Sequence, residues 1–356
     1  DDNPRKEVVF KETPLLLSRI EELLKAGLDF AFYRSPKSDQ VVLLQLSTIK
    51  DEAHHSFDDL WVTCPFSTEH TPYYYRVLSE ESFTLDSNFR DDQFKTLDVP
   101  NSTLNDYRLK VVHAIDEIGK GLLNKVVLHT QVEVAYSREI HRLIHKVLAA
   151  DTEGFRYSFY SAELGLWMGI TPEVLVHSSN SDFKTMALAG TRKLEDLDAN
   201  PFREKERAEQ AWVTKEIVEL LNKSADFMHV GEVETVKAGK LAHLRTIIKG
   251  EINPQFNTAD IARVLHPTAA VCGYPKRLAY RYIEENEILN RSLYSGYLGR
   301  VQKESSSLYV NLRCMSYQEG MIKVYVGAGI TADSDPELET EEIRIKTSTL
   351  ASILMA

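Results

Sequence analysis

The chain has 356 residues, with 42 Lys and Arg against 53 Asp and Glu and a formal net charge of -11. This length exceeds the roughly 250–300 residues at which one hydrophobic core stops growing, so we expect two lobes or one large layered domain. The acidic balance, without a basic stripe, excludes nucleic acid as an expected partner. No apolar run approaches the roughly 20 residues of a membrane span, so neither a membrane protein nor a visible signal peptide is predicted.

The three cysteines, Cys64, Cys272 and Cys314, are too few and too scattered for a disulfide framework or a Cys-based zinc site. They favour a reducing compartment, and we expect a cytoplasmic protein. The sequence carries no signal of assembly, so a monomer is the default expectation.

The predicted elements follow from the spacing of apolar residues and from β-branched and aromatic runs. In chain order we expect a helix at 15–26, a strand at 41–46, a helix at 105–122, a strand at 125–136, a helix at 138–150, strands at 157–161, 166–170, 174–178 and 183–188, helices at 203–224, 258–264 and 275–286, and strands at 308–317 and 321–327. Short turns between several strands favour antiparallel pairing.

The predicted fold class is α+β, with large antiparallel sheets flanked by helices and with a helical middle between two groups of strands. No Gly-x-Gly-x-x-Gly follows a strand, which disfavours a Rossmann fold. No repeat and no Ser/Gly/Pro-rich linker divides the chain, so we expect one interwoven domain.

Polar residues in unusual settings occur from residue 125 onward. Lys125 opens an otherwise apolar strand, and Glu173 follows Pro172 directly before another strand. Taken alone, each is more commonly a solvated charge at a strand end. Gly190 and Thr191 end a strand in small residues, which lets backbone amides approach a ligand, although a plain turn is the commoner interpretation.

Two acidic helical stretches carry candidate metal ligands. Glu209 lies in an acidic amphipathic segment, and Glu342 stacks with Glu339 and Lys346 at helical spacing. Most such charges form an ordinary solvated helix face. Two carboxylates brought together from distant helices would nevertheless suit Mg²⁺, which takes a few protein oxygens and completes its octahedron with substrate and water.

Arg313 and His243 each allow two interpretations. Arg313 lies in an apolar strand-like stretch, where a buried guanidinium needs either a structural carboxylate or a substrate carboxylate as its partner. His243 is either a satisfied core histidine, which is favoured, or a site residue. Ala270, after His266-Pro267, and Gly327 complete the set of unusual positions.

Taken together and in this order, these motifs resemble the chorismate-utilising enzyme family of anthranilate, aminodeoxychorismate, salicylate and isochorismate synthases. The match runs from about residue 125 to the C-terminus. Residues 1–104 are therefore expected as a poorly matched N-terminal part of the fold, and residues 105–356 as the chorismate-binding catalytic region. The resemblance implies two large antiparallel sheets packed as a sandwich with helices outside, and an active site in a deep cleft.

The resemblance also implies a role for each motif residue. Glu209 and Glu342 would hold Mg²⁺, which in turn would bind the ring carboxylate of chorismate. Gln210 stands where many relatives have His after the metal-binding Glu, which puts the tuning of the metal in doubt. The positions expected around the substrate are Gly190, Thr191, Ala270, Arg313, Gly327 and Lys346.

Two positions favour water over ammonia as the nucleophile. Lys125 matches the water-activating lysine of isochorismate and salicylate synthases, and Ala189 occupies a position where aminodeoxychorismate synthases often carry a nucleophilic lysine. The chain is therefore most similar to isochorismate synthases, and no glutamine amidotransferase subunit is expected.

The implied reaction adds water at C2 of chorismate and releases the C4 hydroxyl, with Lys125 as base and Glu173 as acid. At neutral pH a free Lys carries a proton, and a free Glu, with a pKa of about 4.3, has lost its own. The site must therefore favour the neutral amine of Lys125 and raise the pKa of Glu173. Two alternatives stay open: a salicylate synthase, which would go on to eliminate pyruvate, and a non-catalytic relative that binds a carboxylated metabolite. Menaquinone and catechol siderophore formation are both open as the pathway.

Overall fold

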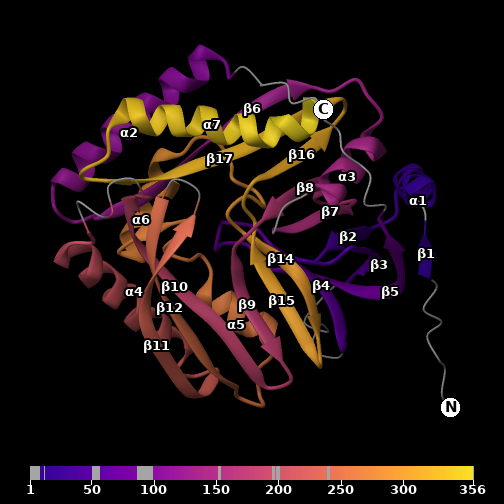
Figure 1. The fold of residues 1–356 in the computed structure, drawn as a ribbon, viewed down its shortest axis with the longest axis horizontal. Helices are drawn as coiled ribbons and strands as arrows, with labels where there is room; N and C mark the ends of the chain where they lie inside the picture. Colours follow the sequence, from indigo (N-terminus) through magenta and orange to yellow (C-terminus); the bar gives the residue numbers. More distant parts are fainter. Residues whose placement is uncertain are drawn as a thin grey trace.

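Helices surround a large, strongly bent β-sheet in the computed structural model (Figure 1). The structure describes residues 9–11, 13–49, 57–85, 99–150, 154–194, 197, 201–238 and 241–355. The helices are α1 (Thr13–Ala26), α2 (Asn101–Gly119), α3 (Ile140–Ala149), α4 (Glu204–Leu221), α5 (Thr258–Leu265), α6 (Lys276–Asn286) and α7 (Pro336–Met355). Each helix predicted from apolar spacing is confirmed to within a few residues, because its apolar stripe packs on the sheet. No helix in the described part of the chain is long and apolar enough to cross a membrane.

Hydrogen bonds join the strands of the described residues into a single 17-stranded sheet. The strands are β1 (Val9–Lys11), β2 (Phe30–Arg34), β3 (Gln40–Thr48), β4 (Asp59–Cys64), β5 (Tyr73–Thr84), β6 (Lys125–Ala135), β7 (Phe155–Ser161), β8 (Gly165–Thr171), β9 (Val174–Ser179), β10 (Asp182–Lys193), β11 (Ala225–Ala238), β12 (Leu241–Ile252), β13 (Gly273–Tyr274), β14 (Tyr297–Gln302), β15 (Ser305–Val310), β16 (Cys314–Gln318) and β17 (Met321–Thr331).

The strand pairing follows one continuous path. Its order is β13-β6-β17-β16-β8-β7-β2-β3-β5-β4-β14-β15-β9-β10-β12-β11. These pairings are all antiparallel, while β1 adds to β5 in parallel. The predicted α+β class with large antiparallel sheets is confirmed, and the two sheets that we expected are joined through the strands in the middle of the path.

The sheet bends so that its two halves pack face to face, as the predicted sandwich requires. Phe155 of β7 stacks on Tyr309 of β15 with 4.1 Å between ring centroids, although six pairings separate these strands in the path. Trp61 and Phe159 pack across the same interior at 6.2 Å. An aromatic core therefore fills the space between the two halves.

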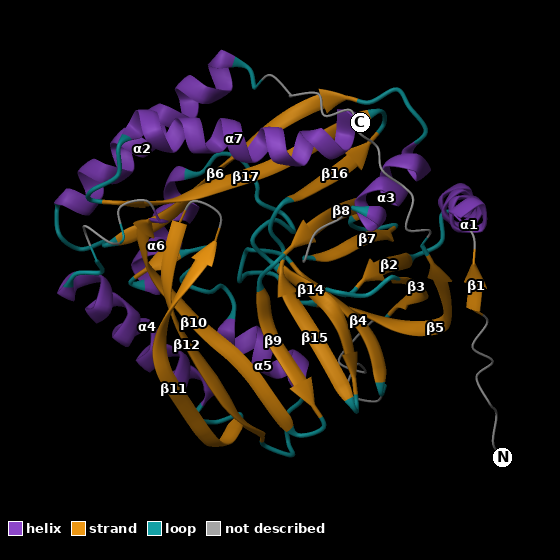
Figure 2. Cartoon of the chain, viewed as in Figure 1, coloured by secondary structure: helices purple, strands orange, loops and turns teal. Residues whose placement is uncertain are grey.

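Two further cores lie on the outer faces of the sheet, under the helices seen in Figure 2. One packs α1, α2, α3, α6 and α7 against strands that include β2, β6, β8 and β17. The other packs α4 and α5 against β9, β10 and β12. The three cysteines are buried and free.

Two expectations about strands are wrong. The predicted strand at 308–317 is two strands, because buried Asn311 leaves the ladder: it accepts a hydrogen bond from Tyr157 Oη at 2.7 Å and donates one to Leu293 O at 2.9 Å. The chain then turns at Arg313, whose φ is 46°.

The expectation of a purely helical middle is also wrong, because β11 and β12 form a long hairpin between α4 and α5. Two register shifts in this pair, between Asp226 and His229 and between Val230 and Val233, break the period of two that would mark a strand in the sequence. β2, β4, β5 and β14 were also not predicted, so residues 30–84 supply much of the middle of the sheet.

Candidate active site

Lys125 begins β6 and lies between two neighbouring strands. Tyr274 of β13 is opposite it on one side and Thr331 of β17 on the other. A Cβ at Gly329 of β17 would lie 2.9 Å from Lys125 Cε. Glycine at this position therefore leaves room for the partly exposed lysine side chain to lie across the neighbouring strand.

Glu173 lies in the turn between β8 and β9, where its backbone carbonyl accepts a hydrogen bond from Val310 N at 3.0 Å. Burial raises the pKa of its carboxyl to about 7, and the positive charge of Lys125 only partly opposes this rise. A carboxyl with a pKa near 7 holds a proton for much of the time at neutral pH, which a general acid requires. The structure thus places the expected acid within electrostatic reach of the expected base.

Glu173 and Ala270 line the same small cavity, which has a volume of about 20 Å³. Apolar residues of β9, β10 and α4 form most of its wall. This space is enough for about one water molecule. The rest of a substrate would have to lie outside this cavity, toward Lys125.

Gly190 forms a β-bulge in β10, where the register with β12 shifts between Ala189 and Thr191. Its φ of +72° is in the left-handed region, and a Cβ there would meet Glu206 at 3.2 Å. The bulge turns the end of β10, which places Thr191 opposite His243.

His243 of β12 lies opposite Thr191. Burial lowers the pKa of His243 to about 4, and the charges of Lys125 and Lys346 lower it further against a hydrogen bond to the backbone of Gly190. Its neutral ring therefore lies within electrostatic reach of both lysines. This burial fits the favoured interpretation as a core histidine, and the alternative of a site residue stays a prediction.

The C-terminal helix brings a second lysine to this region. Lys346 Nζ donates a hydrogen bond to Gly327 O at 2.8 Å and pairs with Glu342 at 2.6 Å. Two residues expected around the substrate are thus in contact. Burial raises the pKa of Glu339 to about 7 against a hydrogen bond from Ser334, and the negative charge of Glu342 adds to the rise.

The two expected metal ligands lie on different helices. Glu209, on α4, forms no ion pair with any residue that the structure describes, while Glu342 is paired with Lys346. Within the described ranges, no three His, Cys, Asp or Glu side chains come close enough together to hold a metal ion. Carboxylate oxygens are ligands that Mg²⁺ prefers, and the binding of Mg²⁺ by Glu209 and Glu342 stays a prediction.

Gln210 points away from the solvent and into the core. Its side-chain amide donates to Ala187 O and to Thr246 Oγ1, both at 3.1 Å. Gln210 therefore fixes α4 to β10 and β12.

Arg313 is not a buried strand residue, so that expectation is wrong. Its side chain is exposed in the turn between β15 and β16 and forms no ion pair with any described residue. Its backbone carbonyl accepts a hydrogen bond from Ile170 N at 3.1 Å. The arginine is thus available to a ligand, and its role toward the substrate stays a prediction.

Sequence reasoning also missed a buried ionic network behind the site. Arg291 binds both carboxylate oxygens of Glu287 at 2.7 Å, and His129 Nδ1 lies 2.9 Å from Glu287 Oε2. Arg291 also donates to Val127 O at 2.6 Å and to Val271 O at 3.0 Å. It therefore ties the strand that begins at Lys125 to the segment that follows Ala270. The i,i+4 spacing of Glu287 and Arg291 is visible in the sequence, but such a pair is typical of an exposed helix end and does not indicate a buried network.

Comparisons with known proteins identify the family. The family model described as chorismate binding enzyme matches residues 55–355. Isochorismate synthase EntC of Escherichia coli (strain K12) is 29% identical over 243 residues, covering 65% of this chain and 62% of EntC. Isochorismate synthase MenF of the same organism is 30% identical over 251 residues, covering 68% of this chain and 58% of MenF. The chain thus spans less than two thirds of the length of these relatives.

Two solved structures share the fold. The crystal structure of a 2,3-dihydroxybenzoate-specific isochorismate synthase, DhbC, from Bacillus anthracis superimposes with a TM-score of 0.75 at 24% identity, covering 94% of this chain and 99% of that one. Anthranilate synthase component I from Streptococcus pneumoniae TIGR4 has a TM-score of 0.68 at 18% identity, covering 98% and 95%. At these identities the likeness shows the fold.

Proposed function

The chain belongs to the family of chorismate-binding enzymes, and from this premise we propose that it is an isochorismate synthase, an isomerase that acts on chorismate. The observation that carries the proposal is that Lys125 lies within electrostatic reach of Glu173, whose pKa burial raises to about 7. An acid and a base within mutual reach are the minimum that this isomerisation requires. The names of the similar EntC and MenF proteins support the same activity.

In the proposed mechanism, Lys125 acts in its neutral amine form, having first lost a proton to solvent. The amine takes a proton from the water that attacks C2 of chorismate. Glu173 gives its proton to the C4 hydroxyl, which leaves as water while the ring double bonds shift. One water is added and one is lost, so substrate and product are isomers. Proton exchange with solvent then restores the starting protonation states of Lys125 and Glu173. By microscopic reversibility, Lys125 acts as the acid and Glu173 as the base in the reverse reaction.

We further propose how the anionic substrate is held in a protein with a formal charge of -11. Lys346 and the exposed Arg313 supply local positive charge, while the backbone at Gly190, Thr191, Ala270 and Gly327 would lie around the ring. Glu209 and Glu342 would hold Mg²⁺, which when bound supplies positive charge for the ring carboxylate. Water as the nucleophile removes the need for a glutamine amidotransferase subunit.

The deciding experiment is product analysis after incubation with chorismate and Mg²⁺. Isochorismate as the only product supports the proposal. Salicylate with pyruvate would assign the chain to the salicylate synthases, and unchanged chorismate would make it a binding protein. Lys125→Gln should remove most of the hydration while the protein still folds, because it keeps the length of the side chain but not its basic nitrogen. Lys323→Gln, an exposed lysine of β17, is the control and should keep parental turnover.

Mg²⁺ dependence has its own test. Turnover should be lost with EDTA and in Glu209→Gln and Glu342→Gln, since each variant keeps its shape and loses a ligand charge. Glu219→Gln, on the same helix as Glu209 and paired only with exposed Lys215, is the control. Turnover that survives both ligand variants and EDTA would contradict the metal assignment.

A further inference from the structure

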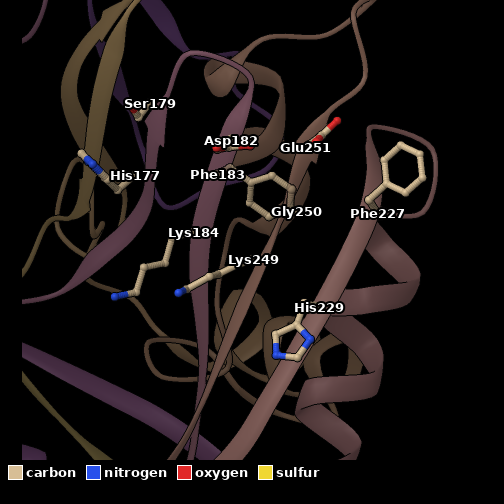
Figure 3. A pocket seen from close by; sticks show the side chains of 10 residues that line it. All are labelled: His177, Ser179, Asp182, Phe183, Lys184, Phe227, His229, Lys249, Gly250 and Glu251. Atoms are coloured by element: carbon tan, nitrogen blue, oxygen red, sulfur yellow. The ribbon is translucent and has the colours of Figure 1, made fainter.

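A second cavity lies away from the proposed active site. It has a volume of about 360 Å³, the larger of the two cavities described here, and it contains none of the residues assigned to chorismate (Figure 3). It opens on β9, β10, β12 and β11. Lys184 in its wall precedes Gly190 by six residues of β10, which is about 20 Å along an extended strand.

Four basic residues stand side by side across these strands. The register places His177 opposite Lys184, Lys184 opposite Lys249, and Lys249 opposite His229. Residues opposite one another in adjacent strands point to the same face, with Cβ atoms roughly 4.5–5.5 Å apart. Figure 3 shows the side chains of Lys184 and Lys249 extending in the same direction.

This basic row lies beside an acidic pair on the same face but forms no ion pair with it. Lys184, Lys249 and His229 form no hydrogen bond or ion pair with any residue in the described ranges, and His177 Nδ1 lies 2.8 Å from Ser307 Oγ. Two acidic residues of the cavity, Asp182 and Glu251, are opposite each other two residues further along, and neither forms an ion pair with the lysines. Like charges placed directly opposite each other are unfavourable unless an anion lies between them.

One exposed aromatic side chain also lines the cavity. Phe183 precedes Lys184 in β10 and therefore points to the opposite face of the sheet, where it is buried in the core under α4 and α5. Phe227 lines the cavity with its side chain 85% exposed and a φ of 50°. An aromatic side chain this exposed on a left-handed backbone is uncommon and favours a role in contacting a ligand.

We propose that this cavity binds a small organic anion that carries two or more negative charges and an apolar part. The anionic group lies between Lys184 and Lys249, and the apolar part lies toward Phe227. A volume of 360 Å³ is in the range of small-molecule sites. Lysine ammonium groups act as flexible point charges, so they accept phosphate and carboxylate oxygens alike. The proposal does not rest on isochorismate synthesis.

Isothermal titration of the full chain at low salt tests the site with three probes: phenyl phosphate, inorganic phosphate and phthalate. We expect saturable binding of phenyl phosphate, and at least tenfold weaker binding of inorganic phosphate, because the latter lacks an apolar part. Phthalate distinguishes carboxylate from phosphate recognition. No chorismate is present, so the result is independent of the catalytic proposal.

Lys184→Gln combined with Lys249→Gln should weaken phenyl phosphate at least tenfold. The control combines Lys37→Gln with Lys237→Gln, two exposed lysines elsewhere, and should bind as the parent does because its net charge changes equally. Phe227→Ala should weaken phenyl phosphate but not inorganic phosphate. The melting temperature of the cavity double variant should equal or exceed that of the parent, since like-charge repulsion is removed. Absence of saturable binding to the parent, equal loss in the control, or equal affinity for the two phosphates would overturn the proposal.

Discussion

Glu173 and Glu287 are two carboxyls withdrawn from water, and they behave in opposite ways. Burial raises the pKa of Glu173 to about 7, and Lys125 offsets this only in part. Burial would also raise the pKa of Glu287, but Arg291 and His129 outweigh it and lower the value to about 2. The difference lies in the partners that each carboxyl has.

This contrast separates a reactive region from a supporting one. Glu287 accepts two hydrogen bonds from Arg291 and one from His129 N, so its negative charge is compensated inside the protein. Glu173 has no carboxylate partner of this kind among the described residues, so its proton is available for chemistry. A partnered buried carboxylate holds the structure together, whereas an unpartnered one can titrate near neutral pH.

Replacing Glu173 by Gln should give the largest effect and should appear in turnover. An amide cannot donate a proton to the leaving hydroxyl, so we expect kcat to fall by about 10²–10⁴-fold with KM nearly unchanged. Steady-state kinetics with chorismate measure this, and Glu304→Gln, an exposed residue of the β14–β15 turn, should match the parent. A raised KM with parental kcat would instead make Glu173 a binding residue.

The same change at Glu287 should act on stability. Glu287→Gln leaves Arg291, whose side chain is only 3% exposed, without its counter-charge, and we expect a loss of about 3–5 kcal/mol in the free energy of unfolding. Urea unfolding measures it. Glu285→Gln removes an exposed ion pair with Arg281 at the same i,i+4 spacing and should change stability little. Equal losses of stability in the two variants would contradict the expected difference between the buried and the exposed ion pair.

The pH dependence of stability should run in opposite directions for the two carboxyls. Between its ordinary pKa of 4.5 and about 7, Glu173 binds more protons in the folded than in the unfolded protein, so its contribution to stability falls as pH rises through this window. Because the side chain keeps some contact with water, Glu173→Gln should become more stable than the parent by roughly 1–3 kcal/mol above pH 7.

Glu287 has a lowered pKa, so its contribution is complete above pH 4.5 and is lost as pH falls toward about 2. Urea unfolding of the parent and both Gln variants at several pH values measures the two slopes. Parallel pH profiles of the two variants would contradict the opposite pKa directions.

The smallest expected effect tests the boundary between the two regions. Gly327 lies opposite His129, and its carbonyl accepts the hydrogen bond from Lys346. A Cβ there would lie 2.4 Å from Tyr294 Oη and 2.7 Å from Leu128 O, so Gly327→Ala should cost roughly 1–3 kcal/mol of stability through overpacking. Because β17 must shift, KM should also rise. A loss of stability without any change in KM would show that packing around Gly327 does not affect substrate binding at the proposed site.

The sequence by itself determined the helices and several strands, and it supplied the residues on which the proposed chemistry rests. Helices such as α1 and α3 are predictable because apolar residues three or four apart are neighbours within a few turns. Lys125 and Glu173 were proposed as base and acid from short motifs and from the resemblance that these motifs carry. The structure places Glu173 within electrostatic reach of Lys125.

Tertiary structure alone decided the contacts between distant strands. β11 escaped prediction because register shifts and exposed polar residues hide its alternation, and only the pairing of β12 with β10 places Lys249 opposite Lys184. Arg291 joins residues 20 and 164 positions away in the chain, which no local pattern can reveal. Whether a carboxyl such as Glu173 or Glu287 is a proton donor or a structural anchor depends on burial and partners. Both are set by the folded sheet, because residues far apart in the chain become neighbours only there.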